Sequence, residues 1–513
     1  MKALLLATVA ALVVLPSGAP APDAGAPAAL NGTWLFDGAP DYPGLRAVQI
    51  AQYGGAAIGE VFTDWYGMIP IRSLEISGDT ATFQMETPSP HDAPTTWTIH
   101  RDGDAIRMTG KIWYQHVDAE GRPGSAAAVA RFLLPPNPLP KLHKLPDNGL
   151  ARTPPMGWSS WNHFADKIDD ATIRQIADAM VASGLRDAGY RYINIDDGWQ
   201  GERDAAGVLH PNAHFPDMKA LADYVHARRL KLGIYSSPGP KTCAGYTGSY
   251  GHAARDAKTF AAWGIDYLKY DLCSGEGIFR TAGEVKAAYQ QMGAALQATG
   301  RGIVFSLCQY GRDAVGTWGR DVGGNLWRTS SDIEDTYASM AKIGFATGGE
   351  AADAGPGGWN DLDMLEIGNG GMSLDEYRTH LTLWAMQAAP LILGNDLRHM
   401  STETRDLLTN RAVIAIDQDP LGAAGQRLRV AGPIEVWSRS LAGGGRALAY
   451  FNCSDKRVAA GGTIAADLGT SSAREAWTGR PLAAGSEVSI PAHGVILLRI
   501  GAPHSQKPAA RPA

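Results

Sequence analysis

The 513-residue sequence predicts an α/β protein: a (β/α)8 TIM barrel with a small antiparallel β domain before it and an antiparallel β-sandwich after it. Three observations predict this arrangement. Strand and turn signals fill residues 31–134, strands alternate with helices over 151–417, and strand signals alone return over 418–501. A chain of this length is expected to form two to four domains.

The first residues have the form of a targeting signal. Lys2 precedes an apolar run from Leu4 to Leu15, and small residues follow it. Because this run is too short to cross a bilayer as a helix, residues 1–21 are predicted as a cleaved signal peptide, with a retained anchor as the alternative. We therefore expect an exported protein, periplasmic or secreted. Residues 22–30, rich in Ala, Pro and Gly, are predicted as a linker.

Residues 31–134 carry short stretches in which apolar and polar residues alternate, with turn sequences between them. A period of two is typical of strands that bury one face. The stretches are 47–50, 80–84, 97–100 and 106–109. They predict a small antiparallel β domain, and the prolines of residues 135–150 predict a stiff linker after it.

From residue 151 to 417, short β-branched or apolar runs alternate with amphipathic stretches. The runs are 192–195, 230–235, 267–270, 303–307 and 390–393, and the helical stretches are 170–183, 218–229, 253–263 and 284–298. Alternation over this length predicts a parallel sheet that closes into an eight-stranded barrel. The repeats alone leave a doubly wound open sheet as the alternative.

After Pro420 the helical pattern stops. Strand-like runs return at 434–437, 446–451 and 494–500. Residues 418–501 are therefore predicted as an antiparallel β-sandwich that packs on the barrel. The tail, residues 502–513, is predicted to be disordered.

Composition and charge are those of an ordinary globular protein. Apolar residues make up 45% of the chain, charged residues 19%, and the net charge is −6. This balance argues against a nucleic-acid or membrane partner and fits a neutral polar one, such as a sugar. The four cysteines lack zinc-ligand spacing, and neither a His-Glu-x-x-His arrangement nor a Walker-type loop occurs. No metal and no cofactor are expected.

Polar and acidic residues gather where the predicted barrel strands end. In a β/α barrel these ends converge on one face, where active sites form. The residues at these ends are Asp196, Asp197, Lys269, Asp271, Cys308, Gln309, Arg328, Asp332 and the run from Trp359 to Asp363. Cleavage of a glycosidic bond needs two carboxyl groups: one attacks the anomeric carbon or activates water, and the other protonates the leaving oxygen.

Asp271 is the candidate nucleophile. It ends a predicted strand two residues after Lys269, so both side chains point the same way and the ammonium favours an ionised carboxylate. A structural Lys–Asp pair is the alternative. Asp332 is the candidate acid, since a helical turn from Arg328 would bring both to one cleft. A helix N-cap or a surface ion pair is the alternative for Asp332.

Asp196 and Asp197 form the remaining acidic pair. A metal pair is one interpretation, but no third ligand stands at a known spacing from them. Two acceptors aimed at sugar hydroxyls are therefore the favoured use.

Seven phrases occur in a specific order along the chain. They are 153–161 (TPPMGWSSW), 195–199 (IDDGW), 232–235 (LGIY), 241–245 (KTCAG), 267–271 (YLKYD), 358–361 (GWND) and 366–372 (EIGNGGM). Each alone is weak. Together they resemble glycoside hydrolase family 27, the α-galactosidase (melibiase) family, over about residues 151–420, with a weaker match to the family's C-terminal β domain.

The resemblance implies a β/α barrel and hydrolysis of terminal α-galactosyl residues by a double displacement that retains configuration. Asp271 matches the nucleophile and Asp332 the acid/base. The residues that match substrate contacts are Trp161, Asp196, Asp197, Tyr235, Lys269, Cys308, Gln309, Arg328 and Met364. Cys243 and Cys273 match a disulfide beside the pocket. The implied partner is a carbohydrate that ends in α-galactose.

Retention sets two physical expectations for the acids. Their carboxyl groups are expected roughly 5–5.5 Å apart. Asp332 must be protonated in the free site, so its pKa is expected to be raised. On the sugar side, Asp196 and Asp197 match acceptors near O4 and O6, which discriminate against an epimer with an equatorial O4.

Two residues depart from the family pattern. Gln309 stands where many members carry Glu, next to Tyr310 where Trp is common, and this puts specificity at C2 in question. Leu362 replaces a proline, which alters a loop rather than the chemistry. The alternatives that follow are a relative with another glycone, such as a β-L-arabinopyranosidase or an isomaltodextran-type α-glucosidase, and an inactive sugar-binding barrel.

Overall fold

The computed structural model describes residues 30–37, 44–53, 56–85, 93–112, 115–346, 351–468, 473–483 and 486–501. The predicted signal peptide, nearly all of the first linker and the whole of the tail lie outside these residues. The chain divides into two compact units, one built from most of residues 30–133 and the other from residue 134 onward. Each unit is described by itself.

The N-terminal unit is a closed antiparallel β-barrel. Its strands are β1 (Gly32–Phe36), β2 (Leu45–Tyr53), β3 (Ala56–Thr63), β4 (Gly67–Ser77), β5 (Thr80–Met85), β6 (Thr95–Asp102), β7 (Ala105–Ile112) and β8 (Gln115–Gly124), followed by the short helix α1 (Ala126–Val129). Trp34 of β1 pairs with Val48 of β2 and with Pro123 of β8, which closes the barrel. On β5, Ala81, Phe83 and Met85 face inward and the residues between them face out, as the period-two pattern predicts.

Residues 135–150 run without helix or strand along helix α7 (Ala282–Ala298). Two glutamine side chains of α7 donate hydrogen bonds to carbonyl oxygens of this segment: Gln290 to Lys141 at 3.1 Å and Gln297 to Pro146 at 3.0 Å. These contacts fix the course of the proline-rich stretch, in which Pro residues supply no N–H for a ladder.

The second unit contains eight parallel strands in the order β17-β16-β15-β14-β13-β10-β9-β18. They are β9 (Met156–Ser159), β10 (Tyr192–Asn194), β13 (Lys231–Ser236), β14 (Tyr267–Asp271), β15 (Val304–Cys308), β16 (Leu326–Arg328), β17 (Trp359–Asp361) and β18 (Leu391–Leu393). A parallel bridge between Leu365, just after β17, and Leu393 of β18 joins the two edges. The predicted barrel is confirmed, and the open doubly wound sheet is wrong.

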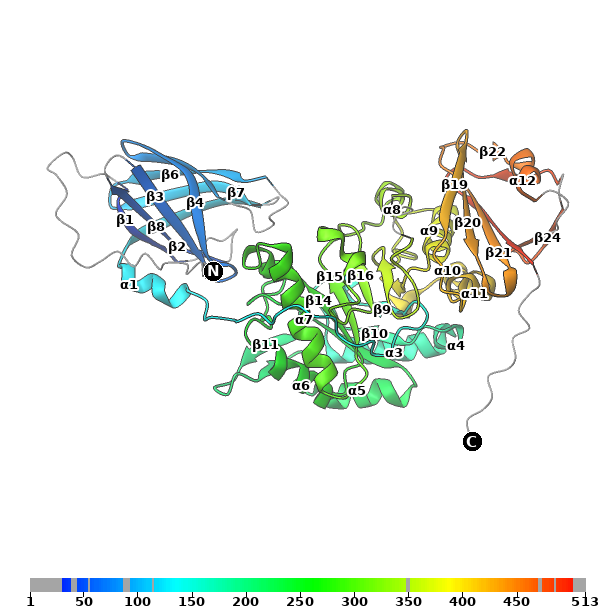
Figure 1. Cartoon of the computed structure of the whole chain (residues 1–513), viewed down its shortest axis with the longest axis horizontal. Helices are drawn as coiled ribbons and strands as arrows, with labels where there is room; N and C mark the ends of the chain where they lie inside the picture. The colour runs from blue at the N-terminus through cyan, green and yellow to red at the C-terminus, as the bar shows by residue number, and fades with distance from the viewer. Residues whose placement is uncertain are drawn as a thin grey trace, which may run out of the picture. The chain divides into compact units, whose positions relative to one another are not determined.

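Helices lie around these strands (Figure 1). They are α2 (Trp161–Phe164), α3 (Asp170–Ala182), α4 (Leu185–Ala188), α5 (Met218–Ala227), α6 (Ala253–Trp263), α7, α8 (Tyr337–Gly344), α9 (Leu374–Gln387), α10 (Thr402–Leu408) and α11 (Arg411–Asp417), with a hairpin of β11 (Gln200–Arg203) and β12 (Leu209–Pro211) after β10. Polar N-caps start the long helices: Asp169 begins α3, Asp217 begins α5, and Thr281 closes a capping box with Glu284 on α7.

The barrel strands are buried on both sides, which fixes where their ends lie. All residues of β9, β10, β15 and β16 are buried, and one continuous apolar core runs from Met156 to the C-terminal domain. Parallel strands covered by helices on the outside and packed side chains within form a rigid frame. Loops that leave their C-terminal ends therefore hold polar groups at defined positions.

The C-terminal domain is built on an antiparallel sheet in the order β19-β20-β21-β26-β23-β24. Its strands are β19 (Gln426–Ala431), β20 (Ile434–Ser440), β21 (Arg446–Asn452), β23 (Ala473–Glu475), β24 (Pro481–Leu482) and β26 (Val495–Ile500), with a second pair of β22 (Val458–Ala459) and β25 (Ser489–Ile490). The three predicted runs become β20, β21 and β26. Helix α12 (Gly461–Leu468) was not predicted, and it packs Ile464 and Leu468 into the domain's core.

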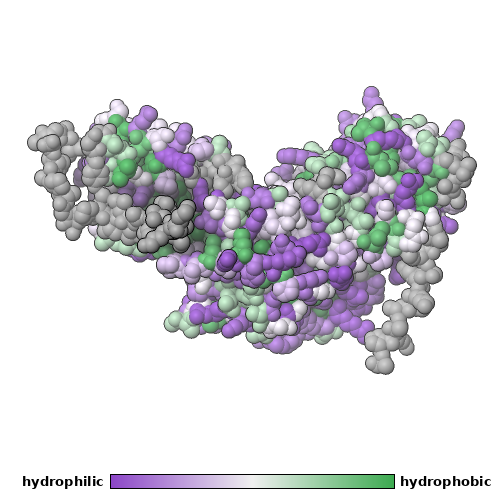
Figure 2. Space-filling view, viewed as in Figure 1, coloured by the Kyte–Doolittle hydropathy of each residue, from purple (hydrophilic) through white to green (hydrophobic). Residues whose placement is uncertain are grey.

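Hydrophilic side chains cover much of the face shown in Figure 2, and hydrophobic ones gather there in small patches. Among the described helices, none is both long enough and apolar enough to span a bilayer.

Candidate active site

One cavity opens at the C-terminal ends of the barrel strands. Its lining residues come from seven of the eight barrel strands or the loops that follow them: Trp161, Asn162, Asp196, Asp197, Tyr235, Cys243, Lys269, Asp271, Tyr310, Arg328, Asp332, Asp363 and Met364. Nine of the eleven catalytic and substrate-contact residues predicted from the sequence are in this set. The exceptions are Cys308 and Gln309.

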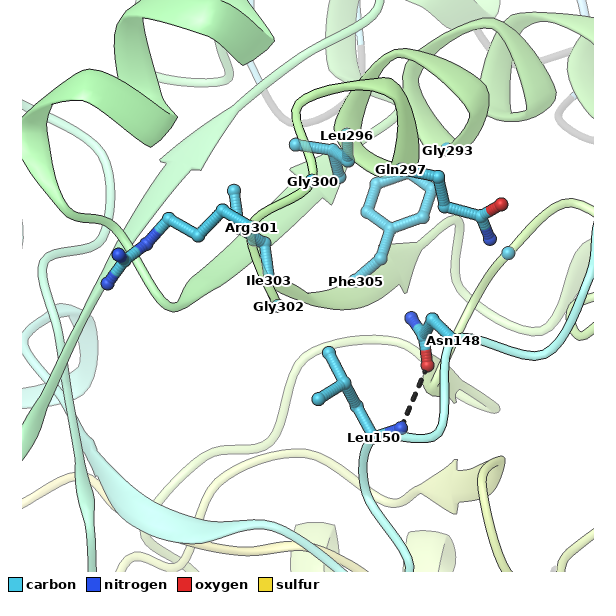
Figure 3. A pocket seen from close by; sticks show the side chains of 11 residues that line it. Asn148, Leu150, Gly293, Leu296, Gln297, Gly300, Arg301, Gly302, Ile303 and Phe305 are labelled. Atoms are coloured by element: carbon cyan, nitrogen blue, oxygen red, sulfur yellow. Dashed lines mark hydrogen bonds between the residues drawn. The ribbon is translucent and has the colours of Figure 1, made fainter.

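A second cavity, of about 280 Å³, lies near the opposite ends of the strands (Figure 3). Asn148 and Leu150 line it ahead of β9, and Ile303 lines it ahead of β15. Its lining includes one charged side chain, Arg301, and no carboxylate. Acid–base chemistry therefore has its groups in the first cavity.

Asp271 is the last residue of β14 and is 4% exposed. Its Oδ1 accepts a hydrogen bond from the hydroxyl of Tyr310 at 2.8 Å. Burial raises the pKa of Asp271 above its ordinary value, while the charge of Lys269 and the Tyr310 hydrogen bond oppose that rise. Lys269 makes its direct ion pair with Asp196, so a closed Lys269–Asp271 pair is not what holds Asp271.

Asp332 follows β16 in a segment without helical structure. Helix α8 begins later and has Thr336 as its N-cap, so the N-cap alternative for Asp332 is wrong. The guanidinium of Arg328, 2% exposed, donates a hydrogen bond to Asp332 at 3.1 Å, while the Asp332 side chain is 70% exposed. Asp332 thus lies at the mouth of the cavity and Arg328 lies below it.

The protonation of Asp332 differs from the sequence-based expectation. The protein around its carboxyl displaces part of the surrounding water and acts to raise the pKa, but the charges of Arg328 and Lys269 outweigh this effect and hold the pKa of Asp332 below its ordinary value. The expectation of a raised pKa is therefore wrong. The physical reason is that two cations, Arg328 and Lys269, lie close enough to favour its charged form.

Arg328 holds a third carboxyl group in the cavity, that of Asp363. The distance between Arg328 Nη2 and Asp363 Oδ2 is 3.0 Å. Asp363 also accepts hydrogen bonds from the backbone N–H groups of Ile333 and Met364, both at 2.8 Å. Burial raises the pKa of Asp363 to about 6 although Arg328 opposes this. Asp363 thus links the Asp332 segment to the loop after β17.

Asp196 and Asp197 follow β10 and are both buried. Asp196 accepts hydrogen bonds from Lys269 at 3.0 Å and from the hydroxyl of Ser159 at 3.2 Å. Asp197 accepts one from the backbone N–H of Ala244 at 2.7 Å, and burial raises its pKa to about 7. Their carboxylates face the cavity as acceptors with fixed orientation.

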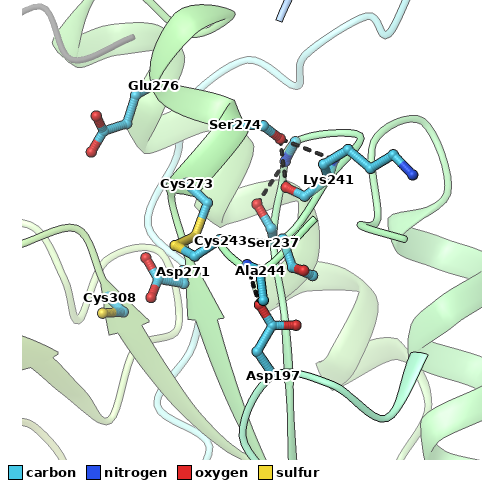
Figure 4. The surroundings of a disulfide bond; sticks show 12 residues. Asp197, Ser237, Lys241, Cys243, Ala244, Asp271, Cys273, Ser274, Glu276 and Cys308 are labelled. Atoms are coloured by element: carbon cyan, nitrogen blue, oxygen red, sulfur yellow. Dashed lines mark hydrogen bonds between the residues drawn. A yellow bond between two sulfur atoms is a disulfide. The ribbon is translucent and has the colours of Figure 1, made fainter. Parts of the chain in front are cut away.

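A disulfide joins Cys243 and Cys273 beside Asp271, and the bond from Ala244 to Asp197 lies next to it (Figure 4). Among the described residues, one group of three metal-ligating side chains is close enough to share an ion: these two cysteines and Asp271. Because the two sulfurs are bonded to each other, neither is available as a thiolate ligand for an ion. Its evident role is to hold the loop that positions Asp197.

Cys308 and Gln309 lie behind the cavity wall. Both are fully buried. The amide nitrogen of Gln309 is 3.5 Å from the carbonyl oxygen of Arg328, and its Oε1 has no partner among the described residues. Direct contact of either side chain with a sugar is not supported by this geometry.

Sequence reasoning did not select three lining residues: Asn162, Tyr310 and Asp363. The signals were available for two of them. Asp363 lies two positions beyond Asp361 in a strand-end phrase, and Tyr310 follows the end of the predicted strand at 303–307. Their roles depend on loop conformation, since Tyr310 and Asp363 both have positive φ angles, of 63° and 83°.

A neighbouring hollow continues from this first cavity on the side of Asp332. The two share Trp161, Asn162 and Asp332, and the hollow adds further carboxyl groups from Glu334, Asp335 and Glu366. Glu366 is buried and accepts hydrogen bonds from the amides of Asn162 and Asn369. A group that leaves past Asp332 would enter this hollow.

Comparison with known protein families agrees with this arrangement. Residues 153–419 match the family model described as alpha galactosidase A, and residues 431–500 match the alpha galactosidase C-terminal beta sandwich domain. The chain belongs to the α-galactosidase A family. It is a glycoside hydrolase of the α-galactosidase type, and its N-terminal barrel lies outside both matched regions.

Individual members of the α-galactosidase A family are similar over most of their length. The α-galactosidase of Cyamopsis tetragonoloba is 48% identical over 341 residues, which cover 65% of this chain and 82% of that protein. The crystal structure of α-galactosidase I from Mortierella vinacea is 36% identical, with a TM-score of 0.64 over 69% of this chain and 98% of that chain. The α-galactosidase of Saccharomyces cerevisiae, solved with raffinose, is 28% identical, with a TM-score of 0.64 over 70% of this chain and 99% of that chain.

Proposed function

We propose that this chain releases terminal α-D-galactosyl residues from oligo- or polysaccharides by a retaining double displacement, with Asp271 as nucleophile and Asp332 as acid/base. The observation that carries the proposal is that both carboxyl groups line one cavity at the C-terminal face of the barrel. Family membership and the α-galactosidase relatives support the substrate.

In the first step, Asp332 gives its proton to the glycosidic oxygen while Asp271 attacks the anomeric carbon. The bond from that carbon to the oxygen breaks, the leaving sugar departs as an alcohol, and a galactosyl ester of Asp271 remains. The hollow beside Asp332 gives the leaving group a place to bind.

In the second step, Asp332 is the base. It takes a proton from water, whose oxygen attacks the anomeric carbon, and the ester bond to Asp271 breaks. Galactose is released with the α configuration and both acids return to their first state. Arg328 and Lys269 hold the pKa of Asp332 below its ordinary value, which suits its role as a base in this step.

The first step needs a proton on the same group. A bound galactoside provides two changes that raise the pKa of Asp332. Its leaving group covers the exposed carboxyl and excludes water, and its O2 hydroxyl competes for the guanidinium of Arg328. Substrate binding and protonation of the acid are therefore coupled in this proposal.

Specificity for galactose is proposed to come from fixed acceptors and donors around the ring. Asp196 and Asp197 accept hydrogen bonds on the O4 and O6 side, and Lys269 donates to O3 and O4. The hydroxyl of Ser159 holds the carboxylate of Asp196, and the N–H of Ala244 holds that of Asp197. An epimer of galactose would therefore leave buried polar groups unpaired. Trp161, Tyr235 and Met364 supply apolar contact.

A panel of nitrophenyl glycosides tests the substrate. We expect the α-galactoside to be hydrolysed faster than the β-L-arabinopyranoside and the α-glucoside, and turnover to require Asp271. Faster turnover of either other glycoside would contradict the galactose assignment, and an inactive sugar-binding barrel would hydrolyse none. Gln309 is the residue that suggests another glycone, but it is buried and does not line the cavity.

We also propose that the chain is exported to the periplasm or the medium. Residues 1–21 have the charge and apolar pattern of a cleaved signal, and the Cys243–Cys273 disulfide is stable outside a reducing compartment. N-terminal sequencing of the protein recovered from the producing cell tests this. A mature chain that begins at Met1 in the cytoplasm would contradict export.

A further inference from the structure

The nucleophile has a hydrogen-bond partner that the double-displacement scheme does not use. The hydroxyl of Tyr310 donates to Asp271 Oδ1 over 2.8 Å, and Tyr310 lines the catalytic cavity.

The backbone around Tyr310 is shaped to make this contact. Tyr310 has a φ of 63°, a left-handed conformation that is unfavourable for a residue with a large side chain. Gly311 follows with a φ of 80°, and a side chain there would meet the carbonyl oxygen of Thr329 at 2.3 Å. A strained residue persists only where its surroundings enforce it, and such residues concentrate at active sites.

Neighbouring groups hold the ring and keep its proton in place. The guanidinium groups of Arg312 and Arg328 lie 5.4 and 5.7 Å from the ring centroid, and the sulfur of Cys243 is 3.7 Å from the hydroxyl. Burial and the charge of Asp271 raise the pKa of Tyr310 well above its ordinary value. The phenol therefore stays protonated and remains a donor over the working pH range.

We propose that Tyr310 is a positioning residue for the nucleophile: its hydroxyl holds Asp271 Oδ1, leaves Oδ2 free to attack, and stabilises the carboxylate as the galactosyl ester breaks. The proposal rests on the proposed function. In the ester, Oδ1 is the carbonyl oxygen, and its hydrogen bond strengthens as negative charge returns to it. The contact thus favours the second step, in which Asp271 is the leaving group.

Two measurable consequences follow from loss of this hydroxyl. The carboxylate of Asp271 loses one hydrogen bond to its charged form, so its pKa rises. Breakdown of the ester slows relative to its formation, so kcat falls while kcat/KM at the pH optimum changes little. A residue that only packed against the cavity wall would move neither quantity in this pattern.

Other charged groups also face Asp271, so its pKa must be read without interference from the acid. The titratable groups around it, besides Tyr310, are Asp197, Tyr235, Lys269, Tyr289, Cys308 and Asp332. Asp332 is the proposed proton donor, so its ionisation would overlap with that of Asp271. An Asp332→Asn background with a dinitrophenyl α-galactoside, which needs no proton donor, removes that overlap, and Asp197 is the same in both variants, so a shift of the acid limb caused by Tyr310→Phe reports on Asp271.

The experiment compares Tyr310→Phe with wild type in this background and in the natural chain. In the background, we expect the acid limb of kcat/KM to move to higher pH by about one unit. In the natural chain, we expect kcat and KM for the same substrate to fall together by roughly tenfold, with a burst of phenol release. Tyr224→Phe is the matched control, because its hydroxyl donates to Asp178 at 2.9 Å on an exposed helix surface.

An unmoved acid limb together with an unchanged kcat in Tyr310→Phe would overturn the proposal. If that variant melts below the assay temperature, Tyr310→Trp carries the same test, since it keeps an aromatic ring and removes the phenol. Failure of the proposed function has a different signature. In that case the natural chain does not hydrolyse the α-galactoside, or hydrolyses it without Asp271.

Discussion

The guanidinium of Arg328 hydrogen-bonds the carboxylate of Asp332, with 3.1 Å between Nη2 and Oδ1. The same nitrogen is 3.0 Å from Asp363 Oδ2. The buried guanidinium of Arg328 therefore pairs with two carboxylates: that of Asp332, exposed at the cavity mouth, and that of Asp363, buried below it. The proposed mechanism uses Asp332 as the proton carrier, and its exposed side chain is open to water and to a leaving group, whereas that of Asp363 is buried.

The first prediction concerns Asp332→Asn. We expect turnover of oligosaccharides to fall about 10²–10⁴-fold, because the leaving sugar departs without a proton. A dinitrophenyl galactoside needs no proton donor, so its loss in kcat/KM is expected to be far smaller. Steady-state kinetics on both substrates check this, and equal losses would count against the acid role.

The second prediction separates Asp363 from Asp332. Asp363→Asn removes the buried partner of Arg328 and two backbone hydrogen bonds to a carboxylate. We expect losses of the order of 10²-fold that are similar for good and poor leaving groups, because the effect is one of misplacement. A loss confined to poor leaving groups would instead identify Asp363 as the proton donor.

The third prediction concerns the disulfide. Replacing Cys243 and Cys273 with Ser opens a loop of 30 residues, which should lower the free energy of unfolding by about 3–4 kcal/mol. It also frees the backbone N–H of Ala244 that holds Asp197, so KM for the galactoside is expected to rise. Cys453→Ser, at an exposed free cysteine, is the control that should change neither quantity.

The fourth prediction is a pH dependence of stability. His380 on α9 is fully buried, its ring lies 4.2 Å from that of Trp384, and neither ring nitrogen has a partner among the described residues. Burial lowers the pKa of His380 to about 3. Because the unfolded chain takes up this proton below pH 6.5, stability is lost as pH falls from about 6.5 towards 3, by about 2–3 kcal/mol between pH 7 and pH 4.5.

His380→Phe keeps an aromatic ring against Trp384 and removes the titration. Denaturant unfolding at pH 7 and pH 4.5 should show a smaller drop in the variant than in wild type. His399→Asn, at a side chain that is 78% exposed, should keep the wild-type drop. An equal drop in the His380 variant would show that this histidine does not contribute.

Some elements of the fold could be predicted from the sequence and others could not. The barrel strands were predictable because buried parallel strands are continuous apolar runs, and the acids at their ends follow from topology. The closure of the N-terminal barrel was not predictable, because the pairing of β1 with β8 joins distant parts of the chain and leaves no local sequence signal. Helix α12 was missed because its Gly-Gly start and short length resemble a loop.

The sequence predicts which residues line the cavity better than it predicts how their side chains are oriented there. Gln309 and Tyr310 are neighbours, yet the first is buried behind the cavity wall and the hydroxyl of the second reaches Asp271. Positive φ angles at Tyr310 and Asp363 decide this, and no residue-type pattern predicts such a conformation for Tyr. The lowered pKa of Asp332 likewise depends on where Arg328 and Lys269 lie.

The central claim is that Asp271 forms a covalent bond to galactose. Its most direct test is to trap the intermediate with a 5-fluoro-galactosyl fluoride, digest the protein and map the label by mass spectrometry. We predict one galactosyl adduct per chain, on the peptide that carries Asp271, and none in Asp271→Asn. A label on another residue, or enzyme that turns over substrate without accumulating any adduct, would contradict the account.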